Sequence, residues 1–173
     1  MRYSVCMNRL VLIAHNLRSS HNVGSLLRTS EGFGIEEVYL SGHTPYPLQA
    51  QDERLPHLAK KQHAQISKTA LGAEKSLGKH TANVNDLLEK LHSEGFVIAA
   101  LEQAPNSQHI SDYKTPEKLA IIAGREVEGI EPEILDKCDV VLEIPMQGQK
   151  ESFNVSVAAA IAIFHSSLIG PNL

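Results

Sequence analysis

Three short stretches of this 173-residue sequence combine glycines with side chains that could hold a ligand. The first contains Asn22, Gly24 and Arg28. On a helix, residues four apart share a face, so Gly24 would let a backbone or a phosphate approach beside the guanidinium of Arg28. An ordinary helix start, with Asn22 as N-cap and a surface arginine, explains the same residues.

The other two stretches lie next to apolar runs. Gly124, Glu126 and Gly129 follow the run LAIIA, and two glycines around a carboxylate can form a turn that wraps a ligand. Ser152 and Asn154 precede an Ala-rich run. These two side chains could cap the helix that begins there or hold a ligand at its free N–H groups.

Several kinds of protein are excluded by missing patterns. The sequence has no Walker loop, no G-x-G-x-x-G fingerprint and no G-x-S-x-G elbow, and its nine histidines show no metal-ligand spacing. Cys6 and Cys138 form no C-x-x-C pair, which favours free thiols in a reduced compartment. The sequence shows no signal peptide, and the apolar run at 155–164 is too short for a bilayer. We therefore expect a cytoplasmic protein without a membrane or metal partner.

Charge is unevenly distributed along the chain. The net charge is −4, but residues 1–80 carry ten Lys/Arg against six Asp/Glu, whereas residues 81–173 carry six against fourteen. Between 54 and 79 the only acidic residue is Glu74; the basic residues there are Arg54, Lys60, Lys61, Lys68, Lys75 and Lys79. This segment could contact phosphates, or it could be a solvated lysine surface.

Short β-rich runs alternate with helical patterns along the chain. The predicted strands are 10–14, 37–40, 96–101, 119–123 and 140–144. The predicted helices are 23–33, about 57–65, a helix from Asn83 or Asn85 that ends at Gly95, 131–137 and 153–168. Residues 41–56 are expected to be irregular, and 66–82 show no clear pattern. This alternation predicts one α/β domain over 1–173, with a mostly parallel sheet sandwiched by helices.

The position of the three stretches in this fold favours a common site. In open parallel sheets, ligands bind beyond the carboxyl ends of the strands. The stretches follow the strands that end near Ala14, Ala123 and Ile144. We therefore expect them to meet at one edge of the sheet.

Taken together, the stretches resemble the three motifs of the SpoU/TrmH family, which are RNA ribose 2′-O-methyltransferases of the SPOUT superfamily. The motifs here are N-V-G-S-L-L-R at 22–28, A-I-I-A-G-R-E-V-E-G-I at 120–130 and E-I-P-M-x-G-x-x-E-S-F-N-V-S-V-A-A-A-I-A at 143–162. The resemblance covers nearly the whole chain, and the third motif is long and specific. Arg125 and Phe153 depart from the usual pattern, which has a small or amide residue and a leucine there.

The resemblance implies a C-terminal deep trefoil knot, a homodimer whose active site uses both subunits, and S-adenosylmethionine as methyl donor. It assigns the cofactor pocket to Gly124, Ile144, Met146 and Phe153. It assigns the catalytic set to Asn22, Arg28, Glu126, Ser152 and Asn154. The Ala-rich run would let the last helix pack closely in the knot and in the dimer interface.

The implied reaction is methyl transfer to a ribose 2′-hydroxyl. A guanidinium stays protonated, so we expect Arg28 to hold the adjacent phosphate and stabilise the developing alkoxide. Glu126 would orient Arg28 or nearby backbone, and Ser152 and Asn154 would position ribose and cofactor. The sequence does not identify the proton acceptor.

Other functions remain open at this stage. The chain could be a dimeric RNA- or cofactor-binding module without turnover, or a small-molecule enzyme that uses another nucleotide. Among RNA substrates, tRNA is favoured over rRNA because the sequence shows no accessory RNA-binding domain. Arg125 could reach RNA or be solvated.

Overall fold

The computed structural model describes residues 8–81, 83–125 and 128–168. In these residues seven strands form one sheet in the order β3-β2-β1-β6-β4-β7-β5, and every neighbouring pair is parallel. The strands are β1 Arg9–His15, β2 Glu37–Ser41, β3 Lys79–Thr81, β4 Val97–Leu101, β5 Gln108–His109, β6 Lys118–Ala123 and β7 Val140–Glu143. The predicted α/β class and parallel sheet are confirmed.

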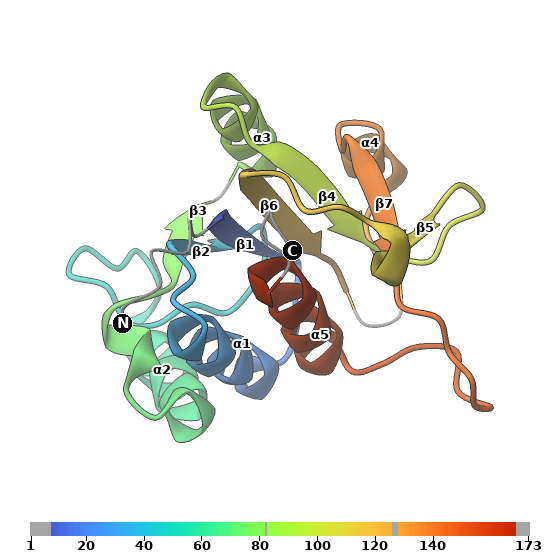
Figure 1. The fold of residues 1–173 in the computed structure, drawn as a ribbon. Helices are drawn as coiled ribbons and strands as arrows, with labels where there is room; N and C mark the ends of the chain where they lie inside the picture. Colours follow the sequence, from blue (N-terminus) through green and yellow to red (C-terminus); the bar gives the residue numbers. More distant parts are fainter. Residues whose placement is uncertain (1–7, 82, 126–127, 169–173) are drawn as a thin grey trace, which may run out of the picture.

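Helices cover both faces of this sheet (Figure 1). They are α1 Ser20–Gly32, α2 Pro56–Ala70, α3 Val84–Ser93, α4 Pro132–Leu135 and α5 Val155–Leu168, with 3-10 turns η1 Ala73–Lys75 and η2 Ile110–Asp112. Apolar side chains of α1, α2 and α5 pack on one face, and those of α3 and α4 pack on the other. None of these helices is long and apolar enough to cross a membrane.

Side-chain alternation along the strands builds the two cores. On β1, Leu10 and Leu12 face α1 and α5, whereas Val11 and Ile13 face α3. Because both faces are covered, the strand reads as a continuous apolar run and not as an alternating one. This is why LVLIA was recognisable as a buried strand.

Two strands were missed, and both lie at the edges of the sheet. β3 has three residues and β5 has two, and their sequences KHT and QH carry no apolar pattern. β3 lies in the segment without a clear pattern, and β5 lies between the predicted strands 96–101 and 119–123, where no helix or strand was predicted. Edge strands of this length are held by backbone bonds to one neighbour, so side-chain periodicity gives no signal of them.

The start of α1 differs from the prediction. The N-cap is Ser19, whose hydroxyl accepts from the Asn22 amide at 3.2 Å, so the prediction of Asn22 as N-cap was wrong. The helix therefore begins three residues earlier than predicted. Asn22 lies in its first turn, with its side chain directed at another element.

Candidate functional site

The carboxyl ends of four strands are aligned in register. Ala14 pairs with Ala123, Ala123 with Leu101 and Leu101 with Leu142 across β1, β6, β4 and β7. The segments that follow these residues therefore leave the sheet at the same edge. This arrangement brings the turn at 124–129 and the segment at 144–154 together.

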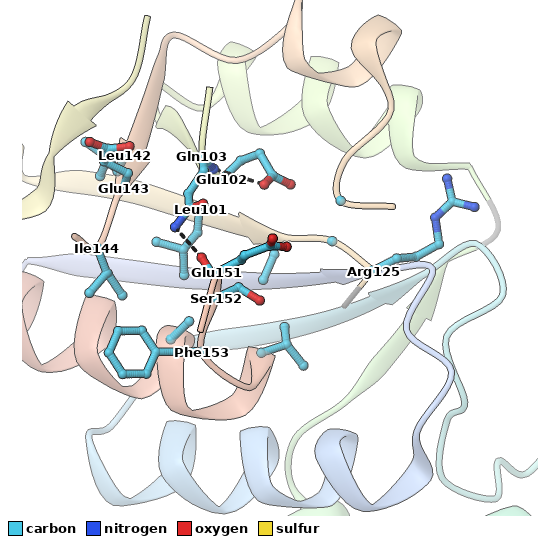
Figure 2. Close-up of a pocket in the computed structure, with 15 residues that line it drawn as sticks. Leu101, Glu102, Gln103, Arg125, Leu142, Glu143, Ile144, Glu151, Ser152 and Phe153 are labelled. Carbon is cyan, nitrogen blue, oxygen red and sulfur yellow. Dashed lines mark hydrogen bonds between the residues drawn. The ribbon is translucent and has the colours of Figure 1, made fainter. Parts of the chain in front are cut away.

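A pocket of about 410 Å³ lies at this edge (Figure 2). The ends of β4, β6 and β7, the turn at 124–129 and the beginning of α5 line it. Of the predicted cofactor residues, Gly124, Ile144 and Phe153 line the pocket, whereas Met146 is half-buried outside its lining. Ser152, predicted to be catalytic, also lines it.

Two backbone hydrogen bonds join Arg125 and Gly129. Arg125 N donates to Gly129 O at 3.2 Å, and Gly129 N donates to Arg125 O at 3.1 Å. A Cβ on Gly124 would lie 2.5 Å from Ile130 Cγ1 and 2.8 Å from the Gly129 carbonyl. The turn therefore requires glycine at 124 for close approach. Glu126, predicted to be catalytic, lies outside the described residues.

Glu102 holds the far side of this turn. Its Oε2 accepts from the Ile130 amide at 3.0 Å, and its Oε1 accepts from the Gln103 amide at 2.9 Å. Gln103 Nε2 in turn donates to the Glu151 carbonyl at 2.9 Å, which ties the end of β4 to the segment before α5. Sequence reasoning missed both residues because it searched after three strands only. The rule that ligands bind beyond the carboxyl ends of parallel strands, applied after Leu101, would have found them.

Asn154 joins the third motif to the first. Its Oδ1 accepts from the Ser156 amide at 2.9 Å, so it caps α5. Its Nδ2 donates to Asn22 Oδ1 at 3.2 Å, across 132 positions of sequence. The two readings of Asn154, cap and site residue, are therefore compatible. One asparagine fixes the helix start and places the first turn of α1 beside the pocket segment.

Arg28 is not brought into the pocket of its own chain. It is exposed on α1, two turns beyond Asn22, and it does not line the pocket. Within the described part of the chain it makes no ion pair within 4 Å. The structure thus brings Asn22, Ser152 and Asn154 to one region and leaves Arg28 on the outer surface.

The sequence analysis expected Arg125 to reach RNA or to be solvated, and the structure gives it another role. Its Nη2 donates to Glu131 Oε1 at 2.8 Å, and its side chain is about a quarter exposed. Figure 2 shows the guanidinium turned away from Ser152 and Phe153. Arg125 is therefore tied to Glu131 at the rim of the pocket and is not an extended, solvated side chain.

Two side chains donate to Glu131, and the ring of His15 lies close to it. Asn16 Nδ2 donates to its Oε1 at 2.9 Å, beside Arg125, and His15 Nε2 lies 3.2 Å from its Oε2. Burial tends to raise the pKa of this carboxyl, but its hydrogen bonds, among them that from Asn16, and the nearby charge of Arg125 lower it overall. The network connects the end of β1 to the pocket turn, and the sequence analysis did not identify it.

The hydrogen bonds around His15 define its tautomer. Asn16 Oδ1 accepts from the His43 amide at 2.9 Å, so the Asn16 Nδ2 group points at both Glu131 and His15 Nε2, the latter at 3.0 Å. Nε2 then accepts, and Nδ1–H donates to Ser41 Oγ at 2.8 Å. Burial lowers the pKa of His15 despite the nearby Glu131. The imidazole is therefore neutral, and Glu131 Oε2 is left without a donor among the described residues.

Comparison with known proteins identifies relatives over nearly the whole chain. The chain is 30% identical to the mouse (Mus musculus) tRNA (guanosine(18)-2′-O)-methyltransferase TARBP1, over 91% of this chain and 9% of the mouse protein. It resembles the crystal structure of an RNA 2′-O ribose methyltransferase at 25% identity, with a TM-score of 0.74 over 96% of this chain and 58% of the other.

The fold is also that of an AdoMet-bound rRNA methyltransferase from Sinorhizobium meliloti, at 18% identity and a TM-score of 0.76, over 96% of this chain and 60% of the other. The chain thus spans only part of the length of each of these proteins. A model of the SpoU rRNA Methylase family matches residues 9–164, which include all three motifs. The chain belongs to this SpoU/TrmH family of RNA methyltransferases, as its motifs predicted.

Proposed function

We propose that this chain transfers a methyl group from S-adenosylmethionine to a ribose 2′-hydroxyl of RNA. The observation that carries the proposal is the Asn154–Asn22 hydrogen bond, which places the first motif beside a pocket built from the second and third. The names of the mouse relative and of the solved RNA 2′-O ribose methyltransferase support the same reaction.

The lining of the pocket fits the proposed cofactor. Leu101, Leu142, Ile144 and Phe153 provide apolar walls of the kind that hold an adenine ring. The carboxylates of Glu102, Glu143 and Glu151 also line the pocket and would favour a cationic ligand. S-adenosylmethionine, when bound, supplies a methyl group on a positively charged sulfur. The AdoMet-bound relative of the same fold supports this choice.

In the proposed reaction the 2′ oxygen loses its proton and forms a bond to the methyl carbon while the carbon–sulfur bond breaks. Asn22, Ser152 and Asn154 would hold the ribose in line with that bond, which supplies much of the rate. Arg28 would hold the adjacent phosphate and stabilise the developing negative charge. Glu126 would orient this arginine or the turn, as the resemblance implies.

We propose that the active enzyme is a homodimer. Phe164 and Val157 on α5 are 52% and 46% exposed, and Phe33 at the end of α1 is 37% exposed. The rings of Phe33 and Phe164 pack edge to face, with centroids 6.2 Å apart. A contiguous apolar patch of this kind is typical of an interface. A second copy on this patch would explain why Arg28 lies outside its own pocket, since it could complete the partner's.

We further propose a C-terminal knot, a cytoplasmic location and a tRNA substrate. Helix α5 packs beneath the middle of the sheet and beside α1 (Figure 1), and the proposed C-terminal knot would hold it there. A cytoplasmic location would give the enzyme access to RNA. Of the RNA classes, we propose tRNA, which the mouse relative's name supports. Because the Sinorhizobium relative is an rRNA methyltransferase, the substrate test must offer both.

The proposal is tested by incubating the protein with labelled S-adenosylmethionine and either transcribed tRNA or rRNA. A methylated 2′ oxygen resists alkaline cleavage, so label should appear in alkali-resistant dinucleotides. Arg28→Ala should reduce transfer at least 100-fold while cofactor affinity by calorimetry stays within a factor of about three, since removal of a transition-state group costs about 2.7–4 kcal/mol.

The matched control is Arg9→Ala, which removes an exposed arginine at the opposite end of β1, where it pairs with Glu36. This variant should retain transfer. Cofactor binding without transfer to any RNA would instead favour a binding module. Loss of cofactor binding in Arg28→Ala would contradict the role given to that residue.

A further inference from the structure

The helix α2 lies in a basic stretch of the chain that contains no acidic residue. From Arg54 to Ala73 the sequence contains no Asp or Glu. Lys60, Lys61 and Lys68 on this helix are all exposed, as is Lys75 just beyond it. This concentration contrasts with the second half of the chain, where acidic residues outnumber basic ones by eight. The surface of α2 is therefore a local positive region on an acidic protein.

Two of the six basic residues between 54 and 79 already have partners within the protein. Arg54 is 15% exposed, donates to Asp52 and Gln62, and stacks 3.5 Å above the ring of Tyr46. Lys79 is ion-paired with Glu37 on β2. The four lysines named above make no ion pair within 4 Å among the residues that the structure describes. Only these lysines are available to a partner.

Helical periodicity places the available side chains on one side of α2. The buried residues Ala59, Ile66 and Ala70 face α1 and the sheet. The opposite side of the helix carries a stripe of four exposed residues at spacings of four, three and four, which are His57, Lys61, Ala64 and Lys68. Lys61 and Lys68 are about 10 Å apart along the axis at 1.5 Å per residue. The stripe contains no large apolar side chain.

The C-terminal part of α2 packs on the first turn of α1, next to the candidate site. Thr69 Oγ1 donates to the His21 carbonyl at 2.9 Å, and Gly24 lets α1 pack directly on the backbone of α2 at Ile66 and Ala70. His21 is the neighbour of Asn22, which accepts from Asn154. Figure 1 shows α1 between α2 and α5. The positive side of α2 therefore faces away from α1 and lies one helix away from the pocket.

We infer that the outward side of α2, through Lys61 and Lys68 with Lys60 beside them, holds the phosphate backbone of the RNA whose ribose enters the site. The inference rests on the proposed function and adds where the RNA lies. Lysines without interleaved aromatic residues contact phosphates and carry no base readout, so the surface supplies affinity and position. An anionic membrane is a poorer match because an interfacial helix needs large apolar side chains opposite its cations, and that side of α2 is buried.

The test compares two double variants of equal charge change. Lys61→Gln/Lys68→Gln removes the stripe, and Lys90→Gln/Lys137→Gln removes two exposed lysines near α3 and α4, on the other side of the sheet. Binding of transcribed tRNA is measured by fluorescence anisotropy at several salt concentrations. The α2 variant should bind about ten-fold or more weakly near 0.1 M salt, with the slope of log Kd against log salt reduced by about 1.5, since each phosphate contact contributes about 0.7–0.9. The control should match the wild type.

The readouts separate this inference from the proposed function. The α2 variant should keep its cofactor affinity and its transfer rate at saturating RNA, with KM for RNA raised. Unchanged RNA binding in this variant, beside an active wild type, overturns the inference and leaves the methyltransferase proposal intact. A wild type that binds no RNA overturns both. Lysine-dependent binding to phosphatidylserine vesicles, without a lysine-dependent effect on RNA, also overturns the inference.

Discussion

At the scale of single residues, the most constrained group is the buried His15 with the partly exposed Glu131 beside it. Five side chains meet there: His15, Asn16, Ser41, Arg125 and Glu131. They join the ends of β1, β2 and β6 to the turn that lines the pocket. Because His15 is neutral and enclosed, protonating it requires the network to rearrange.

This arrangement predicts a pH dependence of stability. The pKa of His15 is lowered in the folded state, chiefly by burial, and the charge of nearby His43 and Arg125 acts in the same direction. Below the unfolded value of about 6.5 the unfolded chain binds more protons, so the free energy of unfolding falls as pH falls, by up to about 1.4 kcal/mol per pH unit for one proton. The lowered pKa of Glu131 acts in the same direction, but only below about pH 4.5.

The measurement is urea unfolding between pH 7.5 and 5. His15→Gln should show a smaller loss of stability over this range than the wild type, because the titrating group is gone. His57→Gln, at an exposed position on α2, should retain the wild-type dependence. An unchanged slope in His15→Gln would show that this histidine is not the group that titrates.

At the scale of elements, the packing of α1 on α2 depends on one glycine. The sequence left open whether Gly24 allows a backbone or a phosphate to approach, and the structure shows a backbone. A Cβ there would lie 2.1 Å from Thr69 Oγ1 and 2.3 Å from the Ile66 carbonyl. The second of these atoms belongs to the α2 backbone and cannot move unless the helices separate.

Gly24→Ala should therefore destabilise the protein by about 1–3 kcal/mol, the usual cost of overpacking. Gly32→Ala provides the control in the same helix, because a Cβ there has no neighbour within 4 Å. Higher helix propensity should leave this variant unchanged or up to about 1 kcal/mol more stable. The urea midpoints of the two variants measure the difference. Equal midpoints would mean that α1 and α2 are not packed as described.

At the scale of the whole molecule, the exposed residues Phe33, Val157 and Phe164 form the proposed dimer interface. Sedimentation equilibrium of the wild type should give twice the chain mass of 18.9 kDa. Phe164→Glu should give the monomer mass, because a charge buried in an apolar interface is strongly unfavourable. Methyl transfer should fall with it if Arg28 acts on the partner's pocket.

The control for this variant is Leu48→Glu, which introduces the same charge at an exposed apolar residue outside the patch. It should remain dimeric. A dimer that survives Phe164→Glu would place the interface elsewhere, and a monomeric wild type would contradict the dimer itself.

Much of the fold was predictable because its information is local. Continuous apolar runs identified the five longest strands, and Asn83 and Gly95 marked the two ends of α3 correctly. The parallel class followed from the alternation of these elements. At the site, the motifs selected Gly124, Ile144, Phe153 and Ser152, and all four line the pocket, while their roles stay predictions. Periodicity alone would not have selected Ile144 or Phe153.

Only the tertiary structure decided which residues far apart in the sequence become neighbours. Apolar spacing indicates which face of a strand is buried, but it does not indicate which strand lies beside it. Parallel strands pair between segments that are far apart in the sequence, and the packing of the whole sheet sets this pairing. Asn22 meets Asn154, His15 meets Glu131 and Lys79 meets Glu37 only in the folded chain. The sequence by itself determined which residues could do chemistry. The order of the strands decided which of them meet, because it sets which strand ends share an edge.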